Sequence, residues 1–275
     1  MKSLKKCFGL AGGRKSGLSF AKILTGLVML TVPLCTSCEQ KKVDVHKVLE
    51  KESYKARDLM IAIPGQNFSI MATEVTQELF ISVMGYNPNE FNGEKNLPVE
   101  SIHWMEAVMF CNKLSKKEGL KPCYSYRGDT DADKWKIGDG EWVHYNRNLN
   151  CDTTANGYRL PTLEEWQYAA KGGQEFKYSG SDNLNDVAWI NEAGSHPVAQ
   201  KAPNGYGLYD MSGNVWEWCW DIAITGQYYK SGMLRYICGG SFIRRNDENY
   251  EVDHKWYFEP TKRFLDIGFR VVKSK

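Results

Sequence analysis

Two carboxylates flank a glycine-containing turn in the second half of the chain, where they could hold a metal ion. Asp210 and Glu217 lie on either side of Gly213-Asn214. A turn of this kind can direct backbone carbonyls inward, and oxygen ligands on a loop are what Ca²⁺ requires. The pattern therefore predicts a calcium site. The alternative is that the two carboxylates hydrogen-bond the amides of their own loop.

Sulfur is the second kind of reactive group. After residue 38 the chain carries an odd number of cysteines, which in an exported protein leaves at least one thiol free or bonded to another molecule. These cysteines are Cys111, Cys123, Cys151, Cys219 and Cys238. Cys123 and Cys151 bracket a loop and could pair. Cys238 precedes a Gly-Gly turn, but we expect no second sulfur beside it, so it is weak evidence for redox catalysis.

The histidines and tryptophans give weaker signals. No two of the five histidines have the spacing of metal ligands, so we expect neither an iron nor a zinc site. Trp216, Trp218 and Trp220 alternate, which places all three on one face of a strand. They could stack on sugars, but filling the core is the favoured interpretation.

The first 37 residues have the pattern of a bacterial signal peptide. A basic stretch leads into an apolar run at 23–34 that is too short to span a membrane comfortably. Small residues then precede Cys38, as at a lipoprotein cleavage site. We therefore predict that Cys38 is lipidated and anchors an exported protein to a membrane, at the bacterial outer membrane or cell surface. The alternative is an ordinary signal peptide or an uncleaved anchor.

Residues 38–56 are expected to form the lipidated N-terminus and a tether, because 39–56 is charged and lacks a sustained apolar period. A short amphipathic helix around Val45 to Tyr54 would be compatible with this. The net charge of the whole chain is +2, but six basic residues precede Cys38 with no acidic residue among them. The remainder is slightly acidic, so we do not expect nucleic-acid binding.

The elements that must position these groups are short. Apolar alternation predicts strands at 60–63 and 68–72, and Thr76 begins a helix that reaches Met84. A second helix covers 105–117, and a third begins at Thr162, where Glu165 completes a capping box. The rest, rich in Gly, Asn, Pro and Asp, predicts short strands and long ordered loops. The class is α+β, with two or three helices.

Three blocks of the sequence resemble the formylglycine-generating enzyme (sulfatase-modifying factor) family. The blocks are Gly157–Trp166, Gly205–Trp218 and Ile267–Val272, with the turn Gly239-Gly240-Ser241 between the last two. The resemblance covers residues 60–272 and implies a variant of the C-type lectin fold. We therefore predict one domain over 57–275, with its first and last strands neighbours in a sheet.

The resemblance also implies that the chemistry of that family is missing. In its catalytic members two cysteines after the Gly-Gly-Ser turn bind copper, and the matching positions here are Arg244 and Asn249. Neither can replace a thiolate, so we expect no copper and no enzyme activity. Relatives that bind calcium imply as ligands the side chains of Asp210 and Glu217 and the backbone carbonyls of Gly213 and Val215. The position that would pair with Cys111 is Val271, which implies that Cys111 is a buried free thiol.

The segment 236–266 differs in texture from its flanks and mixes large aromatics with short polar side chains, as a paratope does. A fixed frame around such an insert resembles the variable proteins of diversity-generating retroelements, in which adenine-containing codons near the C-terminus are randomised. The alternative is drift in a loop freed from catalysis. The predicted ligand-binding residues are Tyr236, Phe242, Arg244, Arg245, Asn246, Asp247, Asn249, Tyr250, His254, Trp256 and Tyr257.

The favoured function is therefore a surface-displayed lipoprotein that binds a protein or glycan through this segment on one exposed face. The alternative is an oxidoreductase that uses Cys238 or an unrecognised metal site in place of the usual copper cysteines.

Overall fold

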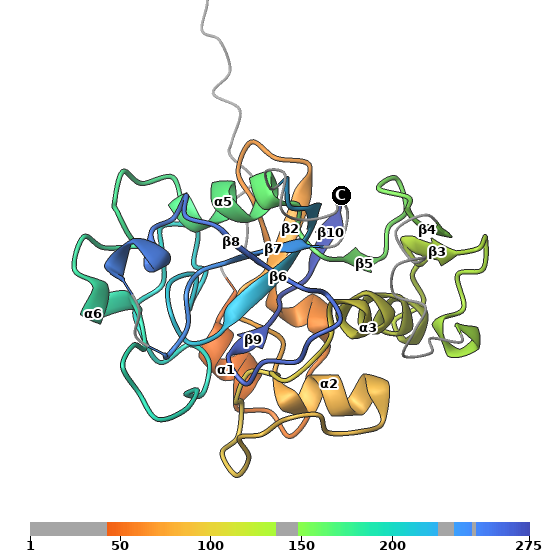
Figure 1. Cartoon of the computed structure of the whole chain (residues 1–275), viewed down its shortest axis with the longest axis horizontal. Coiled ribbons are helices and arrows are strands. Elements are labelled where there is room, and N and C mark those ends of the chain that lie inside the picture. Colours follow the sequence, from red (N-terminus) through yellow and green to blue (C-terminus); the bar gives the residue numbers. More distant parts are fainter. Residues whose placement is uncertain (1–42, 136–147, 225–233, 244–245) are drawn as a thin grey trace, which may run out of the picture. The chain divides into compact units, whose positions relative to one another are not determined.

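The structure, a computed structural model, describes residues 43–135, 148–224, 234–243 and 246–275. The described part is α+β, as predicted, and most of its backbone lies in loops between short strands (Figure 1). The strands form two four-stranded sheets and one two-stranded sheet within these residues. None of the described helices is long and apolar enough to cross a membrane.

The first sheet joins the two ends of the domain. Its strand order is β1-β2-β10-β5, with every neighbouring pair antiparallel. The strands are β1 (Met60–Ala62), β2 (Phe68–Met71), β10 (Val272–Ser274) and β5 (Tyr158–Arg159). The last strand therefore lies beside the second strand of the first hairpin, not beside the first strand itself.

The second sheet carries the segment of unusual composition. Its order is β8-β7-β6-β9, in which only the β6–β9 pair is parallel. The strands are β6 (Trp216–Ile222), β7 (Arg235–Cys238), β8 (Trp256–Phe258) and β9 (Ile267–Gly268). A hairpin of β3 (Tyr124–Tyr126) and β4 (Leu149–Cys151) stands apart. β8 is an edge strand, so its outer side is not paired within this sheet.

The three predicted helices are present, and the two with a predicted cap begin at that cap. Thr76 accepts a hydrogen bond from Leu79 N at the start of α2 (Gln77–Met84), which ends at Gly85 with a φ of 83°. Thr162 forms the predicted capping box at the start of α5 (Leu163–Lys171). Such a cap stabilises a helix by about 1 kcal/mol. The longest helix is α3 (Trp104–Lys117).

Single turns of helix were not all predicted. They are α1 (Val45–Leu49), α6 (Leu184–Val187) and the 3₁₀ turns η1 (Ala56–Leu59), η2 (Ala132–Lys134) and η3 (Asp247–Tyr250). Only α1 had been anticipated, as part of the tether.

The tether prediction is wrong from residue 43 onward. Val45, Val48 and Leu49 of α1 are buried in the main core of the domain. Burying these three apolar side chains stabilises the docked helix, although the segment as a whole is charged. The folded domain therefore begins at least 14 residues earlier than expected. Cys38 and the signal peptide lie outside the described residues.

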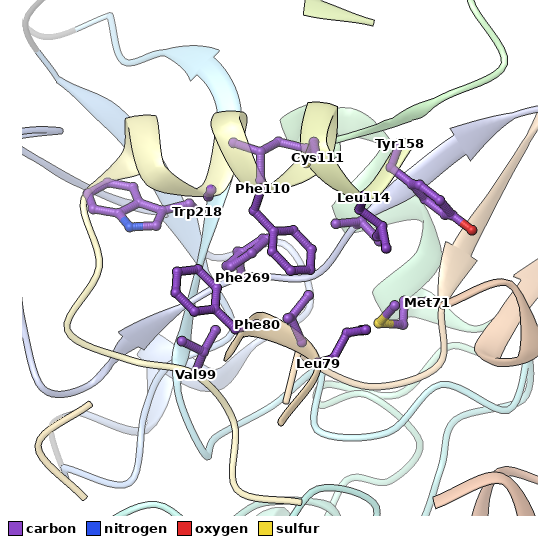
Figure 2. Close-up of a cluster of buried hydrophobic side chains, with 14 of the residues drawn as sticks. Met71, Leu79, Phe80, Val99, Phe110, Cys111, Leu114, Tyr158, Trp218 and Phe269 are labelled. Atoms are coloured by element: carbon purple, nitrogen blue, oxygen red, sulfur yellow. The ribbon is translucent and has the colours of Figure 1, made fainter. Parts of the chain in front are cut away.

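The core packs α2 and α3 against the segment that leads into β10. The rings of Phe80 and Phe110 stack with their centroids 5.6 Å apart, and Phe269 meets Phe110 edge-on at 5.2 Å (Figure 2). Cys111 lies on the same helix as Phe110 and is fully buried and free, as predicted. Burial of this kind raises the pKa of the Cys111 thiol well above its usual value.

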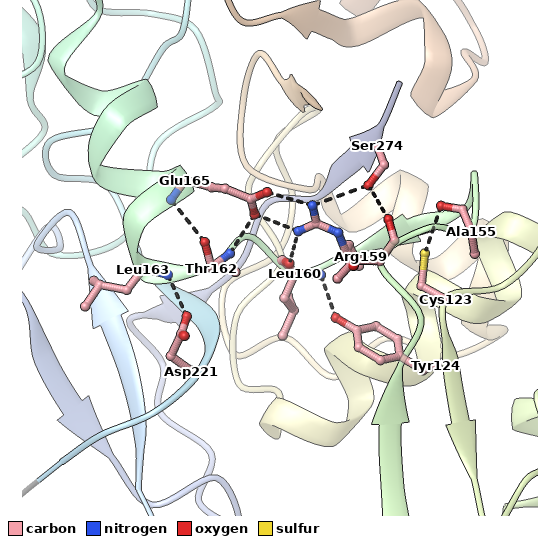
Figure 3. Close-up of polar contacts among 11 residues, drawn as sticks. Cys123, Tyr124, Ala155, Arg159, Leu160, Thr162, Leu163, Glu165, Asp221 and Ser274 are labelled. Carbon is pink, nitrogen blue, oxygen red and sulfur yellow. Dashed lines mark hydrogen bonds and ion pairs between the residues drawn. The ribbon is translucent and has the colours of Figure 1, made fainter. Parts of the chain in front are cut away.

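A polar network fixes the start of α5 against β5 and β10. Arg159 donates two hydrogen bonds of 2.6 Å to Glu165, whose carboxylate also accepts from Thr162 N at 2.9 Å (Figure 3). On the other side, Asp221 accepts from Leu163 N at 2.6 Å. The block at 157–166 therefore has a structural role, in which the charges of Arg159 and Glu165 neutralise each other.

Candidate functional site

The turn predicted to hold calcium is built around a buried guanidinium. Arg270, fully buried, donates to both carboxylate oxygens of Glu217, each at 2.7 Å. Trp166 Nε1 adds a third hydrogen bond to Glu217, at 2.8 Å. Glu217 therefore has its charge neutralised and its oxygens engaged, and it does not fit a role as a calcium ligand.

The other carboxylates around this turn are buried and only partly hydrogen-bonded. Asp210 accepts from Ala199 N at 2.7 Å through one oxygen, while the second oxygen has no hydrogen-bonding partner on another described residue. Burial raises the pKa of Asp210 to about 6. Glu74 is fully buried, neither of its oxygens has a partner on another described residue, and burial raises its pKa well above 4.5. Burying an unpaired carboxylate charge costs free energy, and protonation removes that cost without a metal ion.

The predicted calcium set therefore needs correction. Gly213 has a φ of 86°, and a Cβ there would lie 2.7 Å from the carbonyl oxygen of Trp189. The glycine therefore allows the turn to pack closely against the backbone of Trp189. Val215 is fully buried in the same turn. Among the described residues no group of three or more His, Cys, Asp or Glu side chains could hold a metal ion. The side chain of Glu217 does not fit a calcium ligand, because Arg270 already supplies the positive charge beside it. A calcium site that also uses Asp210 and the backbone carbonyls of Gly213 and Val215 stays a prediction.

The tryptophan block is core, as favoured. Trp216 and Trp218 are buried and Trp220 is half-buried. Trp220 stacks on Trp104 at 5.2 Å, and the guanidinium of Arg235 lies 3.8 Å from the centre of the Trp104 ring. These ring faces are occupied, so they are not a platform for sugars.

The expectation that Cys238 lacks a neighbouring sulfur is wrong. Cys219 Sγ lies 3.9 Å from Cys238 Sγ, and both side chains are fully buried. Burial, followed by the neighbouring Cys238, raises the pKa of Cys219 well above 9.0. A buried thiol with a raised pKa is a poor nucleophile and a poor metal ligand. Cys123 and Cys151, the pair suggested by the sequence, are both free.

Two of the predicted ligand-binding residues are buried and belong to the scaffold. Phe242 is 2% exposed and meets Phe91 edge-on at 5.5 Å. Tyr250 is fully buried, and its ring lies so close to Gly240 that a Cβ there would come within 2.3 Å of it. The Gly-Gly turn thus makes room for Tyr250. Composition could not reveal this, because a buried tyrosine and an exposed one look alike in sequence.

The remaining described candidates fall into two groups. Asn246 and Asp247 are exposed and Asn249 is half-buried, all at η3, the short blue helix beside α6 in Figure 1. Tyr250 anchors η3 there by packing with Leu184 and Val187 of α6. The other group lies at the sheet edge and contains Tyr236, His254, Trp256 and Tyr257. Arg244 and Arg245 lie outside the described residues.

The sheet-edge group is aromatic and partly open. On β8, Trp256 is 48% exposed, and its ring stacks on Tyr257 at 5.5 Å and on His254 at 6.4 Å. Tyr257 lies directly opposite Tyr236 on β7. His254 is half-buried, and burial lowers its pKa, so the imidazole is neutral at neutral pH. The three rings form a stacked row along β8.

Beside this row lies an open groove of about 390 Å³. Leu234, Phe258 and Phe264 line it together with Trp256 and Tyr257, while Glu259 and Lys262 add one charge of each sign. Phe258 and Phe264 pack at 4.4 Å and form part of its wall. Sequence reasoning did not assign Leu234, Phe258 and Phe264 to the site, because composition alone does not show which side chains line a groove. We call this surface the β8 groove.

Comparisons with known proteins agree with the sequence resemblance. The family model described as "Sulfatase-modifying factor enzyme 1-like domain" matches residues 49–275. The chain is 36% identical over 250 residues to "Chaperone protein LppX" of Paenibacillus barcinonensis, covering 82% of this chain and 85% of that protein. It is 35% identical over 244 residues to "Inactive C-alpha-formylglycine-generating enzyme 2" of Mus musculus, covering 74% and 78%.

A solved structure matches as well. "Treponema denticola variable protein 1" superimposes with a TM-score of 0.69 and 34% sequence identity, covering 78% of this chain and 91% of that one. The predicted fold, the C-type lectin-like fold of the formylglycine-generating enzymes, is confirmed by these matches. The likeness to a variable protein on this scaffold is confirmed with it.

Proposed function

This chain belongs to the sulfatase-modifying factor enzyme 1-like family, and we propose that it binds a ligand without catalysing a reaction on it. The positions of the family's copper cysteines carry Arg244 and Asn249. Neither side chain is a soft ligand, and the nearest thiol pair, Cys219 and Cys238, is fully buried. A relative named as an inactive enzyme is compatible with a scaffold that persists without catalysis.

The observation that carries the proposal is the β8 groove with its exposed tryptophan. Isolated large aromatics are mostly buried in monomers, and an open apolar groove beside one is typical of a binding site. Trp256 sits on a strand held by β7, so little side-chain entropy is lost when a ligand covers it. The groove suits an apolar or aromatic group of a protein or glycan ligand, with Glu259 and Lys262 at hand for polar contacts.

Alanine substitution at Trp256 tests this proposal. Binding to a ligand identified on arrays of extracellular proteins and glycans should weaken at least ~10-fold in Trp256→Ala, as for a central aromatic anchor. The matched control is Ile81→Ala on α2, an apolar side chain 37% exposed but outside the segment, which should leave binding within about twofold. Equal losses in both variants would refute the assignment of the site.

We further propose that the segment is diversified by a retroelement. The 34% identical structure named as a variable protein supports this. Variation between isolates should then be confined to positions with side chains at the surface, such as Asn246, Asp247 and Trp256. Phe242 and Tyr250 should stay constant, because the fold buries them. Sequencing the locus from several isolates decides it: substitutions spread evenly over the domain, or unrelated to adenine-containing codons, would count against diversification.

Display at the cell surface is proposed on the sequence of the first 38 residues. A palmitate analogue fed to the cells should label the wild-type protein and not Cys38→Ser. Protease added to intact cells should digest the wild-type domain if it faces outward. Labelling of both proteins alike would exclude Cys38 as the lipidated residue.

The competing oxidoreductase function has a direct assay. The purified protein is incubated with a Cys-X-Pro-X-Arg peptide, copper and oxygen, and loss of the peptide thiol is followed by mass spectrometry. We expect no conversion above background. Turnover would overturn the binding-protein proposal at once.

A second binding function is favoured by one relative. The protein named "Chaperone protein LppX" covers most of this chain at 36% identity. An apolar groove could hold an exposed apolar segment of an unfolded client. If the protein is a chaperone, it should suppress aggregation of several unrelated unfolded proteins. A displayed binding protein should instead leave aggregation unchanged and bind one partner.

A further inference from the structure

A pair of thiols lies across the two central strands of the second sheet. Cys219 on β6 and Cys238 at the end of β7 have their sulfur atoms 3.9 Å apart. Cys238 lies opposite Glu217 in the ladder. Cys219 follows Glu217 by two residues on the same strand, so it shares the face of Glu217 and is the diagonal neighbour of Cys238. The register of the ladder is irregular after Trp218, at the position of Cys219.

We propose that Cys219 and Cys238 form a disulfide when the chain folds in an oxidising compartment. The sulfurs need to approach from 3.9 Å to about 2.05 Å, which requires rotation about the two Cα–Cβ bonds together with adjustment of the backbone where the ladder is irregular beside Cys219. Both thiols lie in the apolar cluster that contains Trp166, Met211 and Val252. The described hydrogen bonds hold neither sulfur to any other residue, so none opposes the rotation.

The other three thiols are kept away from this pair. Cys111 belongs to the separate main core and Cys151 packs against it, while Cys219 and Cys238 lie in the second cluster. Cys123 Sγ approaches the carbonyl oxygen of Ala155, at 3.8 Å. Because mispairing would require exchange between two packed cores, the folded topology selects Cys219–Cys238.

The oxidation balances with an external disulfide such as oxidised glutathione. The thiolate of one cysteine attacks it, releases one glutathione and leaves a mixed disulfide. The second cysteine then loses its proton, attacks the protein sulfur of that mixed disulfide and releases the second glutathione. Two protein thiols are oxidised and one glutathione disulfide is reduced. Because both side chains are fully buried in the folded domain, the exchange must occur while β6 and β7 are still pairing.

The bond would fix the base of the proposed binding segment. It ties the last residue of β7 to β6, immediately before the Gly239-Gly240 turn that leads into η3. The disulfide does not depend on what the segment binds. An experiment that detects or excludes the disulfide therefore leaves the proposed binding function untouched, and the reverse also holds.

Refolding of the full-length chain tests the disulfide. The protein is unfolded and reduced, then refolded in mild detergent either with a glutathione redox mixture or with a phosphine reductant. In the oxidised sample, a non-reducing protease digest should contain the Cys219 and Cys238 peptides joined, with a mass about 2 Da below the sum of the separate peptides. The oxidised protein should melt about 5–10 °C higher than the reduced one.

Two double variants identify the bond. Cys219→Ala/Cys238→Ala should lose the joined peptide and the redox dependence of the melting temperature. Cys123→Ser/Cys151→Ser should keep both. If the alanine variant fails to fold, the digest of the wild-type protein alone decides. Cys219 and Cys238 that both remain free to alkylate after oxidation, or that pair with other cysteines, would overturn the proposal.

Discussion

Replacing Glu74 by glutamine should stabilise the protein, and the gain should grow with pH. Glu74 is fully buried, and neither carboxylate oxygen has a partner on another described residue. Burial raises its pKa well above 4.5, and the neighbouring Asp210 and Glu217 raise it further. Arg270 opposes them, but its guanidinium is already engaged by Glu217.

The sign follows from the direction of the shift. A carboxyl whose pKa is higher in the folded than in the unfolded protein weakens folding as the pH rises above the unfolded value, because only the unfolded chain releases the proton easily. The loss is about 1.4 kcal/mol per pH unit while the folded Glu74 remains protonated. Glutamine keeps the shape and does not titrate. The stability difference between Glu74→Gln and wild type should therefore widen as the pH rises above 5, by at most about 1.4 kcal/mol per pH unit.

Urea unfolding followed by tryptophan fluorescence measures this, since the chain has nine tryptophans. Curves are recorded at half-unit steps from pH 5 to 6.5 for wild type, Glu74→Gln and the control Glu175→Gln. Glu175 is exposed, so its substitution should shift stability by the same small amount at every pH. Asp210 titrates in the same pH range and its charge raises the pKa of Glu74, so the difference between Glu74→Gln and wild type reports the two interacting carboxyls together. A Glu74→Gln difference that is constant or shrinks as the pH rises would refute the assignment of a protonated Glu74.

Three further substitutions probe the scaffold. Arg270→Met should cost about 3–5 kcal/mol of unfolding free energy because it leaves Glu217 buried and unpaired, and adding Glu217→Gln should restore part of it in urea melts. Gly240→Ala should destabilise by about 2 kcal/mol or more, since the new methyl meets Tyr250 at a positive φ, and Tyr250→Ala should then cost less in that background than in wild type. Cys111 should resist a thiol reagent in the native protein and react at once in guanidinium, because burial raises its pKa and closes access.

Local signals were enough to predict the helices and the first hairpin. Thr76 and Thr162 cap their helices through bonds that span three residues, so the information lies within the same short stretch of sequence. The family blocks supplied the fold, because their unusual composition reports a packing arrangement that periodicity alone does not reveal. The alternating tryptophans were interpreted correctly because a two-residue period directly gives the face of a strand.

Contacts between distant residues could not be predicted in this way. Arg270 lies 53 residues from Glu217 and neutralises it, which weighs against Glu217 as the calcium ligand that the local pattern suggested. The Cys219–Cys238 contact depends on the register of β6 and β7, which no residue count reveals. Phe242 and Tyr250 were assigned to the surface because aromatic composition does not distinguish a paratope from a core.

Strand β10 is the last strand to leave the ribosome, yet it lies between β2 and β5 in the first sheet. Until residues 272–274 are synthesised, β2 has one exposed edge and β5 has no strand partner in that sheet. The first sheet can therefore form completely only after almost the whole domain has been translated. We expect this sheet to form late in folding, with the nascent chain held by cellular chaperones until then.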